Sequence, residues 1–261
     1  MIATDLDGTL LRNDRTLSHR TLTALRTAAE AGVEVVFVTA RPPRFVDALT
    51  AATGLAGTAV CSNGAIVYDI ERRTVLSSHP LAVSAARKVV DTLRQAVPSV
   101  GFAVETGHCL RYEPAYLLRL PEDVAAERPV AAPDDLWTVP FVKLLAYSEH
   151  DSADSMLAVA EAVALGEAQF THSGGRGLLE VSALGVGKVG TLAALCAQRD
   201  VEARDVVAFG DMPNDLSILR WAGVGYAMGN AHEAVLAAAG RRTLTNEEDG
   251  VAVALEDLLA R

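Results

Sequence analysis

The sequence has few cysteines, and their arrangement excludes two kinds of cross-linked fold. Cys61, Cys109 and Cys196 are the only three, and no two of them form a Cys-x-x-Cys pair. Scattered thiols in odd number indicate neither a disulfide framework nor a zinc site. Such cysteine usage fits a reducing compartment, so we expect a cytoplasmic protein.

Long apolar runs and dense basic clusters are also missing. No stretch approaches the roughly 20 apolar residues of a membrane-spanning helix, and no basic segment followed by an apolar one marks a secretory leader. The formal net charge is −10, with lysine and arginine spread along the chain. This balance argues against nucleic acid and membranes as partners. A small anionic substrate would then depend on locally placed cations or a metal ion.

Two common nucleotide-binding motifs are incomplete. Gly187-Lys188 is not a phosphate-binding loop, because Val189 replaces the Ser or Thr that this motif requires. Gly223-Val224-Gly225 likewise fails the dinucleotide fingerprint. The six histidines lack the spacing of metal ligands, and the chain has no internal repeat or low-complexity tract.

Apolar material, in contrast, is ample. The chain has 261 residues, of which 50% are hydrophobic and 21% are charged. This composition is typical of a globular protein with a sizeable core. The length lies near the upper limit for one hydrophobic core, so that one large domain and two unequal domains are both reasonable from length alone.

Both ends of the chain alternate strand and helix patterns. Ser18 suits a helix N-cap, and Gly32 suits the position after the last helical turn. Such alternation predicts a doubly wound parallel sheet, an α/β fold of Rossmann-like type. The predicted strands cover residues 1–4, 33–39, 58–61, 206–209, 224–228 and a short segment near 243. The first predicted helix follows Ser18 and ends at 31, and the second begins at 42. Four further helices are predicted over 188–199, 213–221, 231–239 and 251–259.

The middle of the chain has a different character. Strands grouped with few helices predict a separate α+β module there. We therefore predict a discontinuous core of residues 1–80 and 182–261, with residues 81–181 inserted as an α+β cap. Within the cap we expect helices over 84–96 and 152–164, a hairpin of 100–105 with 109–112, and strands over 142–147, 169–172 and 178–181.

The opening residues place two carboxylates at the end of a strand. Asp5 and Asp7 follow a short apolar run at positions i and i+2, so alternation aims both the same way. In open α/β sheets ligands bind at the carboxyl ends of strands, and Gly8 permits a sharp turn there. A solvated turn is the alternative. Met1 to Thr4 is shorter than a usual strand of about five or six residues, which leaves a start upstream of Met1 open.

Further polar clusters fall at other predicted strand ends or beside a core helix. They are Thr39-Ala40-Arg41, Gly187-Lys188 and Gly210-Asp211-Met212-Pro213-Asn214-Asp215. Carboxylates, a lysine and a hydroxyl at one sheet edge would make a magnesium-dependent phosphoryl-transfer site, because Mg²⁺ prefers oxygen ligands and cationic or hydroxyl donors hold the transferring oxygens. On chemical grounds Asp5 suits the nucleophile and Asp7 the general acid.

With these motifs in this order, the sequence resembles the haloacid dehalogenase superfamily, in particular its Cof-like phosphatases with a large cap of type IIB. Residues 5–10 are similar to the first motif, Thr39 to the second, Lys188 to the third and residues 210–215 to the fourth. Two departures are Ala40, where the family often has Gly, and Val189, which separates Lys188 from Gly190. Neither departure removes a reacting group.

The resemblance implies specific roles for these residues. The catalytic set would be Asp5 as nucleophile, Asp7 as acid and base, Thr39 and Lys188. Mg²⁺ would be held by the Asp5 side chain, the Asp7 backbone carbonyl and Asp211, with Asn214 and Asp215 nearby. Candidate substrate contacts are Leu6, Ala40, Arg41, Arg44, Asn63 and Gly64 in the core and Arg111 and Arg176 in the cap.

The sequence therefore predicts a Mg²⁺-dependent phosphomonoester hydrolase for a small phosphorylated metabolite, with a sugar phosphate as the favoured substrate and an aspartyl-phosphate intermediate. A phosphomutase or phosphotransferase shares this chemistry and is the alternative enzyme. A non-catalytic phosphometabolite-binding regulator is the alternative from another class. We expect a monomer or a weak homodimer.

Overall fold

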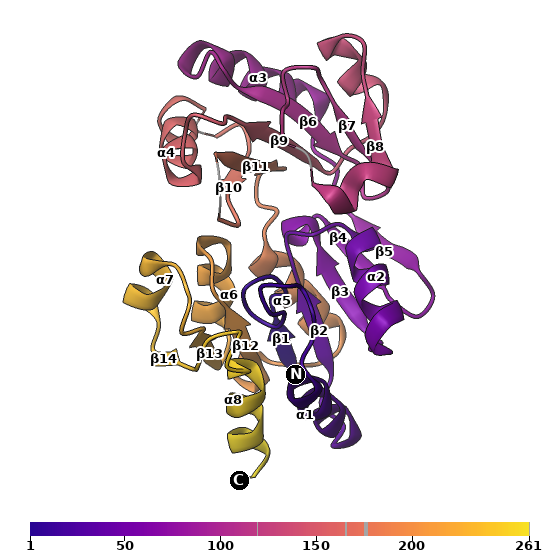
Figure 1. The fold of residues 1–261 in the computed structure, drawn as a ribbon, viewed down its shortest axis with the longest axis vertical. Helices are drawn as coiled ribbons and strands as arrows, with labels where there is room; N and C mark the ends of the chain where they lie inside the picture. Colours follow the sequence, from indigo (N-terminus) through magenta and orange to yellow (C-terminus); the bar gives the residue numbers. More distant parts are fainter. Residues whose placement is uncertain (119, 165, 175–176, 261) are drawn as a thin grey trace.

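The computed structural model describes residues 1–118, 120–164, 166–174 and 177–260, and it contains two sheets stacked along the long axis of the molecule (Figure 1). The lower, core sheet has the strand order β14-β13-β12-β1-β2-β3-β4-β5. Neighbours from β14 to β3 are parallel, and β4 and β5 are antiparallel. Its strands are β1 (Ile2–Thr4), β2 (Val35–Val38), β3 (Thr58–Cys61), β4 (Ile66–Asp69), β5 (Thr74–Ser78), β12 (Val207–Gly210), β13 (Val224–Ala227) and β14 (Arg241–Arg242).

The core helices lie between these strands in the chain, as a doubly wound fold requires. The side chain of Ser18 accepts a hydrogen bond from the Thr21 amide at 3.0 Å, which confirms the predicted N-cap of the first helix. Gly32 follows that helix with φ +79°, as expected for its end. The helices are α1 (His19–Glu30), α2 (Pro43–Thr53), α5 (Lys188–Gln198), α6 (Leu216–Trp221), α7 (Glu233–Ala238) and α8 (Gly250–Leu259).

The register of the central strands brings their carboxyl ends level. Thr4, the last residue of β1, lies opposite Phe37 of β2 and Phe209 of β12. Both faces of these strands are buried, which explains their continuous apolar sequence. The residues that follow β1, β2 and β12 therefore meet at one edge of the core sheet, the edge that faces the second sheet in Figure 1.

The second sheet, the cap sheet, is mixed and has the order β10-β11-β9-β6-β7-β8. The predicted hairpin is confirmed, since β6 pairs antiparallel with β7. Helices α3 (Val83–Ala96) and α4 (Ala153–Val163) pack against one face through residues such as Leu93 and Met156. The cap strands are β6 (Gly101–Glu105), β7 (Leu110–Tyr112), β8 (Glu127–Pro129), β9 (Lys143–Tyr147), β10 (Gln169–Thr171) and β11 (Leu178–Ser182).

Some elements were not predicted from the sequence. Strand β5, the short strand β8 and two 3₁₀ segments, Pro121–Ala126 and Pro133–Thr138, fall in stretches that carry no clear periodicity. Strand β8 pairs parallel with β7, and this pairing, not a local pattern, defines it.

The predicted fold class, a parallel core sheet with an inserted α+β cap, is confirmed, because the whole cap sheet lies in the chain between β5 and α5. The boundaries at 80/81 and 181/182 stay a prediction; β11 continues to Ser182, which pairs with Gln169. Over the described part of the chain, every helix is too short or too polar to cross a bilayer.

Candidate active site

Asp5 and Asp211 extend from neighbouring core strands. The amide of Asp5 donates to the carbonyl of Phe209 at 3.1 Å, which continues the ladder between β1 and β12 past the last residue of β1. Asp211 follows β12 directly. Since the two strands are parallel and in register, both carboxylates reach the same edge of the sheet.

Three carboxylates gather at this edge and form the acidic cluster. One oxygen from each of Asp5, Asp211 and Asp215 lies within 4.8 Å of the others, and all three residues are buried. Lys188 Nζ donates to Oδ1 of Asp5 and to Oδ1 of Asp215, each at 2.7 Å. The hydroxyl of Thr9 donates to Oδ1 of Asp211 at 2.7 Å. Segments more than 180 residues apart in the sequence thus share one network.

Backbone geometry allows this close approach. Gly8 has φ +77°, and a Cβ atom there would lie 2.4 Å from Oδ2 of Asp211. Oδ2 of Asp215 accepts hydrogen bonds from the amides of Asp211 and Met212, both at 3.1 Å. Gly8 is therefore required both for the turn and for space, and Asp215 fixes the loop that carries Asp211.

Burial changes the ionisation of the cluster. It raises the pKa of Asp5 well above its usual range, an effect that Lys188 opposes and Asp215 and Asp211 reinforce. Burial, with the charge of Asp215, raises the pKa of Asp211 to about 7. Burial acts to lower the pKa of Lys188, but the attraction of Asp215 and Asp5 outweighs it, so that this pKa is raised. The single positive charge of Lys188 therefore does not balance the negative charge of the three carboxylates in the acidic cluster.

The acidic cluster fits a divalent cation. A second positive charge beside Asp5 and Asp211 would oppose the rise in their pKa values, because a bound ion is the largest local charge in such a site. Carboxylate oxygens are the ligands that Mg²⁺ prefers. The donor set and its uncompensated negative charge both match the magnesium site expected from the sequence.

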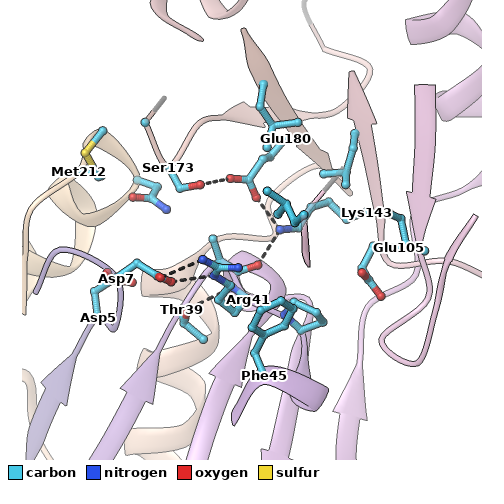
Figure 2. Close-up of a pocket in the computed structure, with 18 of the residues that line it drawn as sticks. Asp5, Asp7, Thr39, Arg41, Phe45, Glu105, Lys143, Ser173, Glu180 and Met212 are labelled. Carbon is cyan, nitrogen blue, oxygen red and sulfur yellow. Dashed lines mark hydrogen bonds and ion pairs between the residues drawn. The ribbon is translucent and has the colours of Figure 1, made fainter. Parts of the chain in front are cut away.

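Asp7 lies beside the cluster and faces another partner. Its two carboxylate oxygens accept from Nε and Nη2 of Arg41, at 2.8 and 2.9 Å. The amide of Arg41 donates to the hydroxyl oxygen of Thr39 at 3.0 Å. Arg41 thus joins the end of β1 to the end of β2, and Figure 2 shows its guanidinium pointing at Asp7.

A cavity of about 550 Å³ separates this edge from the cap sheet. In Figure 2 its lower wall comes from the core strand ends, and its upper wall comes from the cap strands β6, β9 and β11. Core residues in its lining include Asp5, Asp7, Thr39, Ala40, Arg41 and Asn214. Asp5 and Asp7, the catalytic aspartates predicted from the sequence, therefore line a cavity large enough for a small metabolite.

Two ion pairs close the sides of the cavity. Arg44 donates to both oxygens of Glu105 at 2.9 and 2.8 Å. Lys143 Nζ donates to Oε2 of Glu180 at 2.5 Å and to the carbonyl of Ala40 at 2.8 Å. The Arg44–Glu105 pair and the contact of Lys143 with Ala40 join the cap sheet to core segments, whereas Lys143 and Glu180 pair within the cap sheet.

The remaining predicted substrate residues fall in different places. Asn63 accepts from Asn214 at 3.1 Å and donates to Glu180 at 2.8 Å, so it links the fourth motif to the cap. Neither Leu6 nor Gly64 is among the described residues that line the cavity. Arg111 is also outside that lining, and its side chain donates to the carbonyl of Asp135 at 2.8 Å. Arg176 lies outside the described residues.

Several cavity residues were missed from the sequence. Glu105, Glu180 and Phe45 line the cavity, as do leucines of the cap. Lys143, on a predicted cap strand, also lines the cavity. Strand alternation divides the cap-strand residues into two faces: Lys143 and Leu145 project to the cavity, while Leu144 and Ala146 pack under the cap helices.

Comparisons with known proteins agree with this geometry. Residues 2–255 match the family described as haloacid dehalogenase-like hydrolase. The chain is 30% identical to a pyridoxal phosphate phosphatase of Escherichia coli, over 97% of this chain and 96% of the relative. It is 30% identical to a 5-amino-6-(5-phospho-D-ribitylamino)uracil phosphatase of Bacillus subtilis, over 98% and 96%.

Among solved structures, a subclass IIB sugar phosphatase of the same superfamily superposes with a TM-score of 0.83 at 19% identity, covering 98% of both chains. This likeness concerns the fold, including the type of cap. The chain therefore belongs to the haloacid dehalogenase-like hydrolase family, where it is a Cof-like phosphatase of subclass IIB, as its ordered motifs indicated.

Proposed function

We propose that this phosphatase is a Mg²⁺-dependent phosphomonoesterase that carries the phosphoryl group on Asp5. The observation that supports the proposal most directly is the contact of Lys188 with both Asp5, which lines the cavity, and Asp215, next to Asp211. A carboxylate attacks phosphorus only when ionised. Because burial raises the pKa of Asp5, it needs both the ammonium and a bound cation to stay charged.

In the first step Asp5 attacks phosphorus. Lys188 engages Oδ1 of Asp5, so the second oxygen forms the new bond. As the bond from Asp5 to phosphorus forms, the bond from phosphorus to the alcohol oxygen breaks. Asp7 gives its proton to that departing oxygen. Thr39, whose oxygen accepts from the Arg41 amide, directs its own proton toward the phosphoryl oxygens.

In the second step water releases the phosphate. Asp7, now deprotonated, takes a proton from the attacking water. The water oxygen binds phosphorus, and the bond to Asp5 breaks, which restores the carboxylate. Asp7 must therefore stand beside both the departing oxygen and the water, and its place at the mouth of the acidic cluster, where its side chain is 40% exposed, suits this double role.

Mg²⁺ would be held by the side chains of Asp5 and Asp211 and by the backbone carbonyl of Asp7. When bound, it supplies positive charge to the transferring phosphoryl oxygens. Both carboxylate oxygens of Asp215 are engaged, one by Lys188 and the other by backbone amides, so we assign Asp215 to holding Lys188 and the loop. Asn214 is held through Asn63.

The substrate is a small phosphorylated metabolite. The relatives compared above are named for pyridoxal phosphate, for a phosphoribitylamino uracil and for sugar phosphates, and a sugar phosphate was favoured from the sequence. A phosphomutase would use the same first step with a sugar hydroxyl as acceptor in place of water. Incubation with a bisphosphorylated sugar separates the two: we expect free phosphate, whereas an isomerised monophosphate would indicate a mutase.

The direct test is Asp5→Asn. This variant keeps the shape of the side chain but removes the attacking charge, and we expect turnover of p-nitrophenyl phosphate with Mg²⁺ to fall at least about a thousandfold. The melting temperature is the control for folding, since loss of a buried charge from a crowded acidic cluster does not weaken packing. Retention of more than a few per cent of activity would assign the nucleophile elsewhere. Absence of any turnover by the parent protein would favour a binding regulator.

A further inference from the structure

The upper wall of the cavity is the face of the cap sheet opposite α3 and α4. Alternation along the strands sorts the side chains: Phe102 and Val104 of β6 and Leu144 and Ala146 of β9 join the core under the helices. The intervening positions on β6, β9 and β11 point the other way, toward the phosphatase site. What this face presents is therefore what the body of the substrate would meet.

Close to the core, this face and the core rim form a belt of paired charges. Arg41 contacts Asp7, Arg44 contacts Glu105, and Lys143 contacts Glu180. Three cations and three carboxylates thus neutralise one another around the middle of the cavity. A second phosphate or carboxylate that bound within the belt would have to break one of these pairs, at the cost of leaving its partner uncompensated.

Beyond the belt, the upper wall is a cluster of leucines that we call the leucine roof: Leu110, Leu118, Leu120, Leu145 and Leu178. They come from β7, β9, β11 and the segment after β7. The register places Leu145 directly opposite Glu180 on one side and Ala103 on the other. Leu118, Leu145 and Leu178 are only partly buried and pack on a small apolar cluster that contains Tyr116 and Tyr147.

A partly exposed leucine cluster inside a cavity has a physical consequence for binding. Covering apolar surface is favourable in proportion to the area removed from water. A hydroxyl placed against the same surface loses its water partners and is disfavoured when nothing replaces them. The roof therefore favours an apolar group and disfavours a polyhydroxylated one.

We infer that the substrate is a phosphate monoester whose far end is uncharged and apolar, with this end under the leucine roof and the phosphate at the acidic cluster. The inference rests on the proposed function, because it takes the phosphate position from it. Sugar phosphates and bisphosphates should accordingly be poor substrates.

The test compares esters of similar leaving-group reactivity. 2-Phenylethyl phosphate, ethyl phosphate and glucose 6-phosphate are all esters of primary alcohols. p-Nitrophenyl phosphate is the control that measures whether the core catalyses phosphate release at all. We expect kcat/KM for 2-phenylethyl phosphate to exceed that for ethyl phosphate and for glucose 6-phosphate at least tenfold. Equal values, or a preference for the sugar ester, would overturn the inference while leaving the phosphatase assignment intact. Failure on every ester, p-nitrophenyl phosphate included, would overturn the proposed function itself.

Variants of the leucine roof test whether it causes the preference for the apolar ester. Leu145→Asn and, separately, Leu178→Asn should lower the ratio of kcat/KM between 2-phenylethyl and ethyl phosphate about tenfold. Leu117→Asn is the matched control, because this cap leucine is 56% exposed and is not among the described lining residues; its ratio should equal that of the parent. If a roof variant does not fold, inhibition of the parent protein is measured instead, with 2-phenylethanol and with glucose as inhibitors. We expect a lower inhibition constant for 2-phenylethanol. The reverse order would contradict the inference.

Discussion

Arg41 holds both carboxylate oxygens of Asp7, with Nε 2.8 Å from Oδ2 and Nη2 2.9 Å from Oδ1. While both oxygens accept hydrogen bonds from this guanidinium, Asp7 is not placed to donate to a leaving group. The acid role proposed for Asp7 therefore requires Arg41 to exchange Asp7 for another anion. The phosphate of the substrate is the anion that arrives at this place.

From this exchange we predict that Arg41→Met raises KM more than it lowers kcat. A charge-assisted hydrogen bond contributes about 1.5–3 kcal/mol, so KM for p-nitrophenyl phosphate should rise about 10- to 100-fold. Inhibition by inorganic phosphate should weaken in parallel. Steady-state kinetics with phosphate as inhibitor measures both quantities. An unchanged KM would mean that Arg41 stays on Asp7 and never binds the substrate.

The core half of the site was predictable because its reacting groups lie in contiguous motifs at strand ends. Because β1 and β12 are parallel and in register, Asp5 and Asp211, which follow these strands in the sequence, lie side by side in the fold. Lys188 could be placed because its motif opens a core helix, α5.

The cap half could not be predicted in the same way. Glu105 and Lys143 meet through cross-strand pairing between β6 and β9, which local sequence does not specify. Arg111 is an example. Its charged side chain lies on β7, next to a strand that lines the cavity, but it donates to the backbone of Asp135 and lies outside the described lining. In the cap, which side a residue faces depends on a register that only the folded sheet reveals.

Lys188 should be essential for stability when no metal is present. Its removal leaves Asp5 and Asp215 buried without their cation, and breaking a buried pair typically costs about 3–5 kcal/mol. We therefore expect Lys188→Met to lose that much free energy of unfolding in urea with chelator, and to recover part of it when Mg²⁺ is added.

The matched control for this measurement is Lys88→Met. Lys88 pairs with Glu167 on the surface, where its side chain is 64% exposed, and exposed pairs contribute about 0–1 kcal/mol. A similar loss in the two variants, or no recovery with Mg²⁺, would contradict the role assigned to the acidic cluster.

The raised pKa of Asp211 links magnesium binding to pH. Because the pKa is about 7 in the folded, metal-free protein, the favourable contribution of this group is complete below about pH 4 and is lost as the pH rises through 7. Mg²⁺ must displace the proton at low pH, so it should bind more weakly there. We expect Mg²⁺ to raise the melting temperature more at pH 8 than at pH 5.5.

Differential scanning calorimetry with and without Mg²⁺ checks this dependence. Asp211→Asn removes the titrating group and should reduce the difference between the two pH values. A magnesium effect in the parent protein that is equal at pH 5.5 and pH 8 would show that no carboxyl of the cluster exchanges a proton for the ion.

Glu180 connects the cap to two segments of the core. It accepts from Lys143 and from Asn63 through Oε2, and from Ser173 through Oε1. Lys143 in turn donates to the carbonyl of Ala40. Burial acts to raise the pKa of Glu180, but Lys143 and its other donors outweigh this and the pKa is lowered. The carboxylate therefore stabilises the fold above about pH 4.5, and this contribution is lost as the pH falls through the lowered folded value.

A double-mutant cycle measures the pair. Lys143→Met alone leaves a buried carboxylate, and Glu180→Gln alone leaves a buried ammonium, so each should cost about 3–5 kcal/mol of unfolding free energy at pH 7. The double variant removes both charges and should cost clearly less than the sum. As the pH falls below 4.5 toward the lowered folded pKa of Glu180, the loss in Glu180→Gln should shrink, since the parent then loses its own charge. Additive losses at pH 7 would mean that the two groups act separately and that the pair does not stabilise the fold as a unit.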